Sequence, residues 1–360
     1  MNKIAPRQLY FFLAAIAPVG KIILMPTRLV AYSGNDLLFP AALHILVQAA
    51  IIFFVVLLAE SGESFYGLLA LTLGKIAAKI LSVLFALFLF YAALLPLLEQ
   101  KLLVQSVFYD TLPSTIAFAP FFLFSAYLCA KPLSSFGRTW DILAPFSVAG
   151  FAGILLFSLG NADFGALAPV GAAGGTGFLR GTAYTVSWFF DSAIVLSLTG
   201  KIDYRKGMAW KSALFYLLGG AALLLFLATF YGIFSDVAVR QIFAFTKISK
   251  YFSGIAVLGR VDYLFIFALS LVMAFYCALP LQAGIDCVVQ AFNPEGGRIL
   301  PAALSVAVNL TMLLFSVFLD FFFRSTQDAI AGTLFWIFPV FTVLLPLLCL
   351  PLRRNRERLS

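Results

Sequence analysis

Long apolar segments alternate with short polar segments along the whole chain. Most apolar segments have about 20 residues, the length at which an α-helix crosses the hydrocarbon core of a bilayer. The pattern predicts ten transmembrane helices, five on either side of a gap rich in Gly and Ala. The expected spans are Gln8–Ala31, Leu38–Ala59, Lys79–Gln100, Thr115–Cys129, Trp140–Leu159, Phe178–Leu198, Trp210–Phe234, Tyr263–Ile285, Leu300–Leu319 and Ile330–Leu352. We therefore expect an all-α polytopic membrane protein.

Composition excludes the other broad classes. Of the 360 residues, 62% are hydrophobic and 11% are charged, whereas globular chains are about 45–50% apolar and about 25% charged. A soluble domain could not bury this much apolar surface. An outer-membrane barrel would show short alternating segments instead of long apolar runs.

The positions of the charges predict the orientation of the chain. If the N-terminus is cytoplasmic, most of the 24 Lys and Arg residues lie on the cytoplasmic side. By the positive-inside rule this favours an even number of helices with both termini cytoplasmic. The basic tail 353–360 is expected to contact anionic membrane lipid. The net charge of +8 does not indicate a nucleic-acid partner, because the basic residues flank apolar runs and form no basic groove.

The first span resembles a secretory signal but is expected to remain in the protein. Ala15-Ile16-Ala17 matches a cleavage pattern. Pro18 follows it directly, however, and its fixed φ and missing N–H disfavour the extended substrate pose that cleavage needs.

Motifs for catalysis, metals or cofactors are not found. His44 is the one histidine, and the four cysteines have no paired short spacing, so neither a metal site nor a disulfide framework is indicated. The run Gly174–Gly181 resembles a nucleotide-binding loop, but it lacks the required spacing and a preceding strand. We interpret it as a flexible linker, and we expect a protein that is not an enzyme and has no cofactor.

Polar residues inside the apolar spans are the candidates for function. A charge at the centre of a membrane helix costs about 2.5–3.5 kcal/mol on insertion scales, so it is expected to face the bundle interior or a wet cavity. Lys21 lies well inside the first span and follows Pro18, Val19 and Gly20. Pro and Gly favour a broken helix there, whose free backbone groups could bind a carboxylate, an ammonium group or an ion.

Two acidic residues, Glu99 and Asp191, also lie inside apolar spans, as Lys21 does. Glu99 follows a proline late in the third span, where it either neutralises Lys21 or lies at the outer interface beside Lys101. Asp191 lies mid-span in the sixth helix, in the patch Ser187-Trp188-Phe189-Phe190-Asp191-Ser192. Its setting indicates a partner for a cation or an amine, or a group that carries a proton; the alternative is a packing role.

The interrupted helices are the first and the sixth, which open two sets of five. That is the pattern of inverted-repeat transporters, with a ligand site at the membrane midplane between broken helices. We expect one transmembrane domain over 1–360, with repeats at about 8–159 and 178–352. Apolar residues with helical spacing between the seventh and eighth spans indicate either a lid over the site or a plain connector: Phe245, Ile248, Phe252 and Ile255.

The residues resemble those of a known family, the B subunits of spore germination receptors, which form the spore-permease branch of the amino acid–polyamine–organocation superfamily. Order and spacing carry the resemblance over nearly the whole chain. The matching segments are Ala5–Leu9, Lys21–Pro26, Glu99, Thr111–Pro113, Gly137-Arg138 with Pro145, Asn161–Asp163, Leu167–Val170 and Gly259–Asp262. Many relatives have Gly in place of Lys21, a Glu near Ala193 and a Glu in place of Gly259.

The resemblance implies two inverted five-helix repeats of the LeuT type, residence in the spore inner membrane or cell membrane, and a complex with A and C subunits. It implies that the chain recognises a small nutrient, such as an amino acid. Carried over position by position, the ligand site comprises Pro18, Val19, Gly20, Lys21, Leu95, Glu99, Ser187, Trp188, Phe189, Asp191, Phe275 and Tyr276.

Together these features predict a nutrient-sensing permease-like subunit. The main alternative is a secondary amino-acid transporter, coupled to protons through Asp191 or Glu99. A polytopic enzyme is disfavoured, because the sequence offers no set of nucleophile, base or metal ligands.

Overall fold

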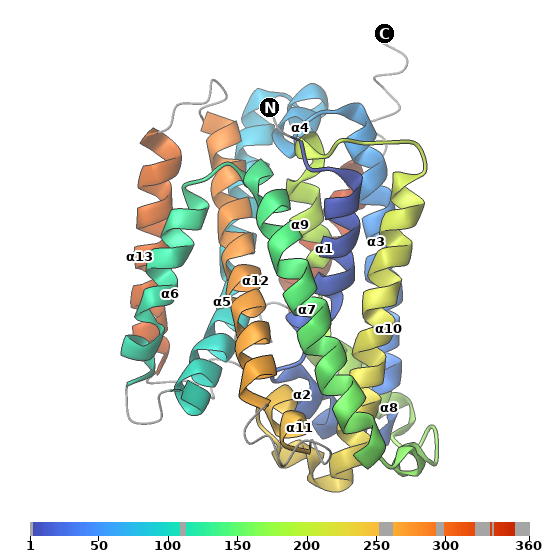
Figure 1. Ribbon diagram of the computed structural model, residues 1–360. Helices are drawn as coiled ribbons and strands as arrows, with labels where there is room; N and C mark the ends of the chain where they lie inside the picture. The colour runs from blue at the N-terminus through green and yellow to red at the C-terminus, as the bar shows by residue number, and fades with distance from the viewer. Residues whose placement is uncertain are drawn as a thin grey trace.

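The computed structural model describes residues 3–108, 113–251, 262–292, 299–320, 332 and 335–349, and these residues are almost entirely helical. Figure 1 shows helices packed side by side in one bundle. The named helices are α1 (Pro6–Val19), α2 (Met25–Ser33), α3 (Leu38–Leu58), α4 (Phe65–Leu73), α5 (Lys75–Phe108), α6 (Ser114–Cys129), α7 (Phe136–Ser158), α8 (Gly174–Thr185), α9 (Asp191–Ser197), α10 (Met208–Phe234), α11 (Ala244–Ile248), α12 (Asp262–Phe292) and α13 (Ile299–Asp320). A further apolar helix runs over Phe335–Cys349 and contains a π-helical turn at Val340–Leu344.

Six helical segments among the described residues are long and apolar enough to cross a membrane: Leu38–Ser61, Lys75–Val107, Gly137–Asn161, Met208–Arg240, Tyr263–Phe292 and Ile299–Phe318. Ile116–Cys129 and Phe335–Cys349 are apolar but shorter. The prediction of a helical, multi-pass membrane protein is thereby confirmed. The first and sixth predicted spans are not among the six, because each is divided into two short helices.

Both predicted interruptions are present. The first span is split into α1 and α2 by residues 20–24, and the sixth into α8 and α9 by a short 3₁₀ turn and two further residues, 186–190. All of α9 and most of α1 are buried. The α1 and α9 halves of the two interrupted spans therefore lie in the interior of the bundle, and α8 is largely exposed. The helices α6 and α13 lie together at one side of the bundle (Figure 1).

Backbone contacts hold the two interrupted spans together at one end. The N–H of Ile4 donates to the carbonyl of Lys201 at 2.8 Å, and the N–H of Asp203 donates to the carbonyl of Ile4 at 3.0 Å. The chain entering α1 and the chain leaving α9 thus pair directly. A backbone group with no water to bind costs several kcal/mol at membrane depth, so such pairing is expected wherever the helical pattern stops.

The interpretation of Gly174–Gly181 as a flexible linker was wrong, because α8 begins at Gly174. Two of these glycines, Gly177 and Gly181, serve close packing instead. A Cβ at Gly181 would lie 2.1 Å from the Ser33 hydroxyl oxygen, and one at Gly177 would lie 3.3 Å from the Tyr32 carbonyl oxygen. The lack of side chains lets α8 approach α2 closely.

Glycine also determines the contact between α1 and α10. A Cβ at Gly219 of α10 would lie 2.0 Å from the backbone carbonyl oxygen of Ala14. Backbone atoms cannot move aside as a flexible side chain can. We predict that Gly219→Ala forces the two helices apart and destabilises the protein by about 1–3 kcal/mol, measured as a lower melting temperature of the purified protein.

Gly175→Ala is the matched control, because nothing lies within 4 Å of a Cβ at this helical position. Its melting temperature is expected to be unchanged or slightly higher, since alanine favours helix over glycine. Equal melting temperatures for Gly219→Ala and wild type would contradict the close packing of α1 on α10.

Candidate functional site

A buried ion pair joins the two interruptions. The Lys21 Nζ, between α1 and α2, lies 2.7 Å from the Asp191 Oδ2 at the start of α9, and both side chains are fully buried. The two residues are 170 positions apart in sequence. Lys21 is thus not directed out of the bundle, and its carboxylate partner comes from the other interrupted span.

The ammonium group of Lys21 has two further contacts. Its Nζ donates to the carbonyl oxygen of Ile16 at 3.2 Å, and it lies 5.1 Å from the centroid of the Phe189 ring. That carbonyl is accessible because α1 ends at Val19, so that the N–H of Gly20 donates to Pro18 and not to Ile16. The cation is therefore surrounded by a carboxylate, a main-chain carbonyl and an aromatic face.

Asp191 has a second donor on one oxygen and no partner on the other. The Tyr216 hydroxyl of α10 donates to Oδ2 at 2.6 Å, while the buried Oδ1 has no hydrogen-bond partner. Asp191 thus links α9 to α10 as well as to Lys21. Its free oxygen leaves one acceptor available inside the site.

Three consecutive aromatic residues of the second interruption face three different neighbours. Trp188 donates its indole N–H to Glu99 Oε1 at 2.7 Å. Phe189 lies between Lys21 and the stacked ring of His44, and Phe190 packs against Tyr276. Because this segment is not a regular helix, its successive side chains can surround the site.

His44 packs against the second interruption and α8. Its Nε2 lies 3.0 Å from the carbonyl oxygen of Thr182, and its ring is stacked on Phe189 at 4.6 Å between centroids. No group of three or more His, Cys, Asp or Glu side chains suited to a metal ion occurs in the described part of the chain.

Glu99 does not neutralise Lys21, which is paired with Asp191 instead. The Glu99 side chain is fully buried in the bundle, and its position at the outer interface stays a prediction. Its Oε1 accepts the Trp188 N–H, while its Oε2 has no hydrogen-bond partner. Lys101 is buried too, and its Nζ donates to the carbonyl of Ser316 at 2.8 Å.

Tyr276 completes the group of polar side chains. Its ring packs directly against Gly20, where an added Cβ would lie 2.2 Å from the ring. It lies within electrostatic reach of both Asp191 and Glu99, and its hydroxyl has no partner, as is also true of the Ser187 hydroxyl. We call Lys21, Glu99, Ser187, Asp191 and Tyr276 the polar cluster.

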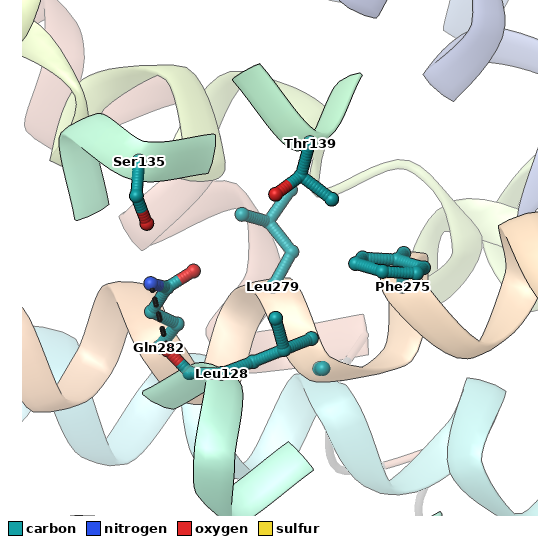
Figure 2. Close-up of a pocket in the computed structure, with 7 residues that line it drawn as sticks. Leu128, Ser135, Thr139, Phe275, Leu279 and Gln282 are labelled. Carbon is teal, nitrogen blue, oxygen red and sulfur yellow. Dashed lines mark hydrogen bonds between the residues drawn. The ribbon is translucent and has the colours of Figure 1, made fainter. Parts of the chain in front are cut away.

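The remaining predicted site residues divide into two groups. Pro18, Val19 and Leu95 are buried apolar neighbours on α1 and α5. Phe275 instead lines a separate, small pocket of about 10 Å³ between α6, α7 and α12, together with Thr139 and Leu279, as Figure 2 shows. That volume holds about one water. Phe275 thus does not face the polar cluster.

Sequence reasoning missed two side chains that support the cluster. Tyr216 donates to Asp191, and the Gln48 Oε1 accepts the backbone N–H of Ser192 at 3.0 Å in the first turn of α9. Each is a polar residue inside a long apolar helix, which is the signal that identified Lys21. Such residues are easily overlooked, because they carry no charge.

The segment predicted to be a lid contacts the first interruption. The N–H groups of Ala244 and Phe245 in α11 donate to the carbonyls of Ile23 and Ile22 at 2.9 and 3.2 Å. Phe245 and Ile248 are buried as the spacing indicates, while Phe252 and Ile255 lie outside the described residues. A pocket of about 350 Å³ adjoins α11 and is lined by Arg240, Lys247 and Lys250, among other residues. Lid movement stays a prediction.

The ion pair yields a stability prediction. Removing one partner of a buried pair leaves an uncompensated charge and costs about 3–5 kcal/mol, whereas replacing both partners avoids that charge. We predict that Lys21→Met and Asp191→Asn each lower the melting temperature strongly, and that the double variant is more stable than the sum of the single effects implies.

The control is the exposed pair formed by Arg205 and Asp203, 3.5 Å apart. Exposed pairs contribute little, so Arg205→Ala is expected to change stability by less than about 0.5 kcal/mol. Additive losses in the double variant at Lys21 and Asp191 would show that the two groups do not pair.

Comparison with known proteins places this geometry in context. The structure is similar to a crystal structure of MhsT in complex with L-phenylalanine, with a TM-score of 0.59. MhsT is a transporter with the LeuT fold. The two sequences are 14% identical, and the match covers 94% of this chain and 87% of that chain. At this identity the likeness shows the fold. A search of curated proteins finds no match. A model of the family described as spore germination protein matches residues 3–318. Because that match spans most of the sequence, the chain belongs to the spore germination protein family of permeases.

Proposed function

We propose that this protein is the nutrient-sensing subunit of a spore germinant receptor and that it binds an amino-acid-type small molecule at the polar cluster. The observation that carries the proposal is the buried pair of Lys21 and Asp191 between the two interruptions. Charged residues at membrane depth are expensive and mark ligand or ion sites by default. Family membership supports a role in germination.

The ion pair suits a zwitterionic ligand. An amino acid that enters between the two side chains would present its carboxylate to Lys21 and its ammonium group to Asp191. The contact between Lys21 and Asp191 is then replaced by two contacts with the ligand, and no buried charge is left without a partner. The unpartnered Asp191 Oδ1 and Tyr276 hydroxyl offer further hydrogen bonds, which the ligand-free cluster lacks.

Access to the site would involve the interruptions and α11. Binding a ligand between Lys21 and Asp191 must separate them, so the first interruption, or the start of α9, would have to move. Because α11 donates hydrogen bonds to the carbonyls of residues 22 and 23, movement at the first interruption is transmitted to α11. We propose that this coupling carries the signal of ligand binding.

For the architecture we propose ten crossings in two inverted repeats of five, with both termini cytoplasmic. The six long apolar helices, the two shorter ones and the two interrupted spans together supply ten segments. The proposed location is the spore inner membrane, with A and C receptor subunits as partners. The proposed role is non-enzymatic.

Ligand-induced stabilisation tests the binding site. A ligand that binds only the folded state raises apparent stability, by about 2.7 kcal/mol at a hundredfold excess over Kd. We predict that at least one compound in a screen of the common L-amino acids and simple sugars raises the melting temperature of the wild-type protein. The double variant Lys21→Met/Asp191→Asn is expected to show no such shift, and Arg205→Ala is expected to retain it.

An equal shift in the double variant would place the ligand elsewhere. The same preparation distinguishes sensing from transport, since proteoliposomes that contain this chain alone can be tested for uptake of the radiolabelled compound. Sensing predicts binding without uptake. Saturable uptake that requires no partner subunit would favour the transporter alternative.

A further inference from the structure

In the interior of the bundle, no cation among the described residues forms an ion pair with the carboxyl group of Glu99. It is fully buried on α5. Lys21, the cation of the cluster, is already within 2.7 Å of Asp191. An ionised carboxylate without a cation would add one uncompensated negative charge at membrane depth, which is strongly unfavourable.

The groups around Glu99 are mainly neutral. Trp188 of the second interruption donates its indole N–H to Oε1. Tyr276 and Cys277 of α12 lie within electrostatic reach of it, and the backbone N–H of Leu24, in the first interruption, lies within hydrogen-bonding reach of the carboxyl group. Arg28 of α2 acts on the carboxyl group through space. Arg28 does not contact Oε2, which has no hydrogen-bond partner.

The two oxygens of Glu99 therefore differ. Oε1 accepts a hydrogen bond from the Trp188 indole N–H at 2.7 Å. Oε2 has none, although a buried carboxylate oxygen normally accepts hydrogen bonds. A protonated oxygen can donate a hydrogen bond instead. Tyr276, whose buried hydroxyl also lacks a partner, lies within electrostatic reach of the Glu99 carboxyl group.

We propose that Glu99 is a proton-binding site, whose carboxyl group carries a proton on Oε2 at neutral pH in the ligand-free protein. With Lys21 positive and Asp191 negative, the polar cluster then has no net charge. When the proton passes to water, the O–H bond breaks, the bonding electrons stay on Oε2 and the cluster becomes negative. Glu99, and not Asp191, is thus the group whose protonation changes the net charge of the cluster with pH or during proton coupling.

Infrared spectroscopy tests this directly on the ligand-free protein in lipid nanodiscs, independently of the proposed ligand. The carbonyl stretch of a protonated carboxylic acid is resolved from that of a carboxylate. We expect the wild-type spectrum at neutral pH to contain an acid band that Glu99→Gln removes. Glu60→Gln, at an exposed position, is the matched control and is expected to leave the band intact.

One further variant and one further measurement protect the test against a folding defect. Trp188→Phe keeps Glu99 but removes its donor, so we expect the acid band to shift in position and not to vanish. Glu99→Gln is expected to melt within a few degrees of wild type, because a neutral amide replaces a neutral acid. An acid band that survives Glu99→Gln, or a loss of stability as large as that of Lys21→Met, would show that Glu99 is ionised.

Discussion

The ion pair between Lys21 and Asp191 is the constraint on which the interior of this protein depends. Two fully buried charges, 2.7 Å apart, join segments that are 170 residues apart in sequence. Bringing such groups out of water is costly, and their attraction offsets the cost only when the geometry is good and other groups complete the hydrogen bonding. Ile16, Phe189 and Tyr216 supply those contacts.

The same requirement explains the environment of the interruptions. A helix that stops inside a membrane exposes backbone groups that only protein can satisfy. Here α11 binds the carbonyls of residues 22 and 23, and Gln48 accepts the N–H of Ser192. The hydroxyl of Ser192 donates to the carbonyl of Thr342, in a π-helical turn of another helix. The interruptions are thus part of a network that extends beyond the two broken spans.

This network relates the fold to the proposed function. A continuous helix could not present free backbone groups to a ligand beside the ion pair, because its backbone hydrogen bonds are satisfied internally. Because the support comes from α3, α10 and α11, a ligand that separates Lys21 from Asp191 would disturb contacts on several elements. A receptor subunit needs such a connection between its ligand and the rest of the molecule.

Much of the architecture could be predicted from sequence. The apolar segments located the helices, and Pro18 and Gly20 located the first interruption. The second interruption was indicated by polar and aromatic residues around Asp191, although it has neither Pro nor Gly. The pairing itself could not be derived, because the partners of Lys21 and Glu99 depend on how the helices are rotated against each other. Gly174–Gly181 was misinterpreted for the same reason, since its closeness to α2 exists only in the packed bundle.

The central claim is that the polar cluster between the two interruptions receives the ligand. The most direct test is a structure, by cryo-electron microscopy in nanodiscs, of the protein saturated with the amino acid that stabilises it most. The account predicts ligand density between Lys21 and Asp191, with the two side chains no longer in direct contact. Ligand density elsewhere, for example in the pocket beside α11, with the ion pair intact, would contradict it.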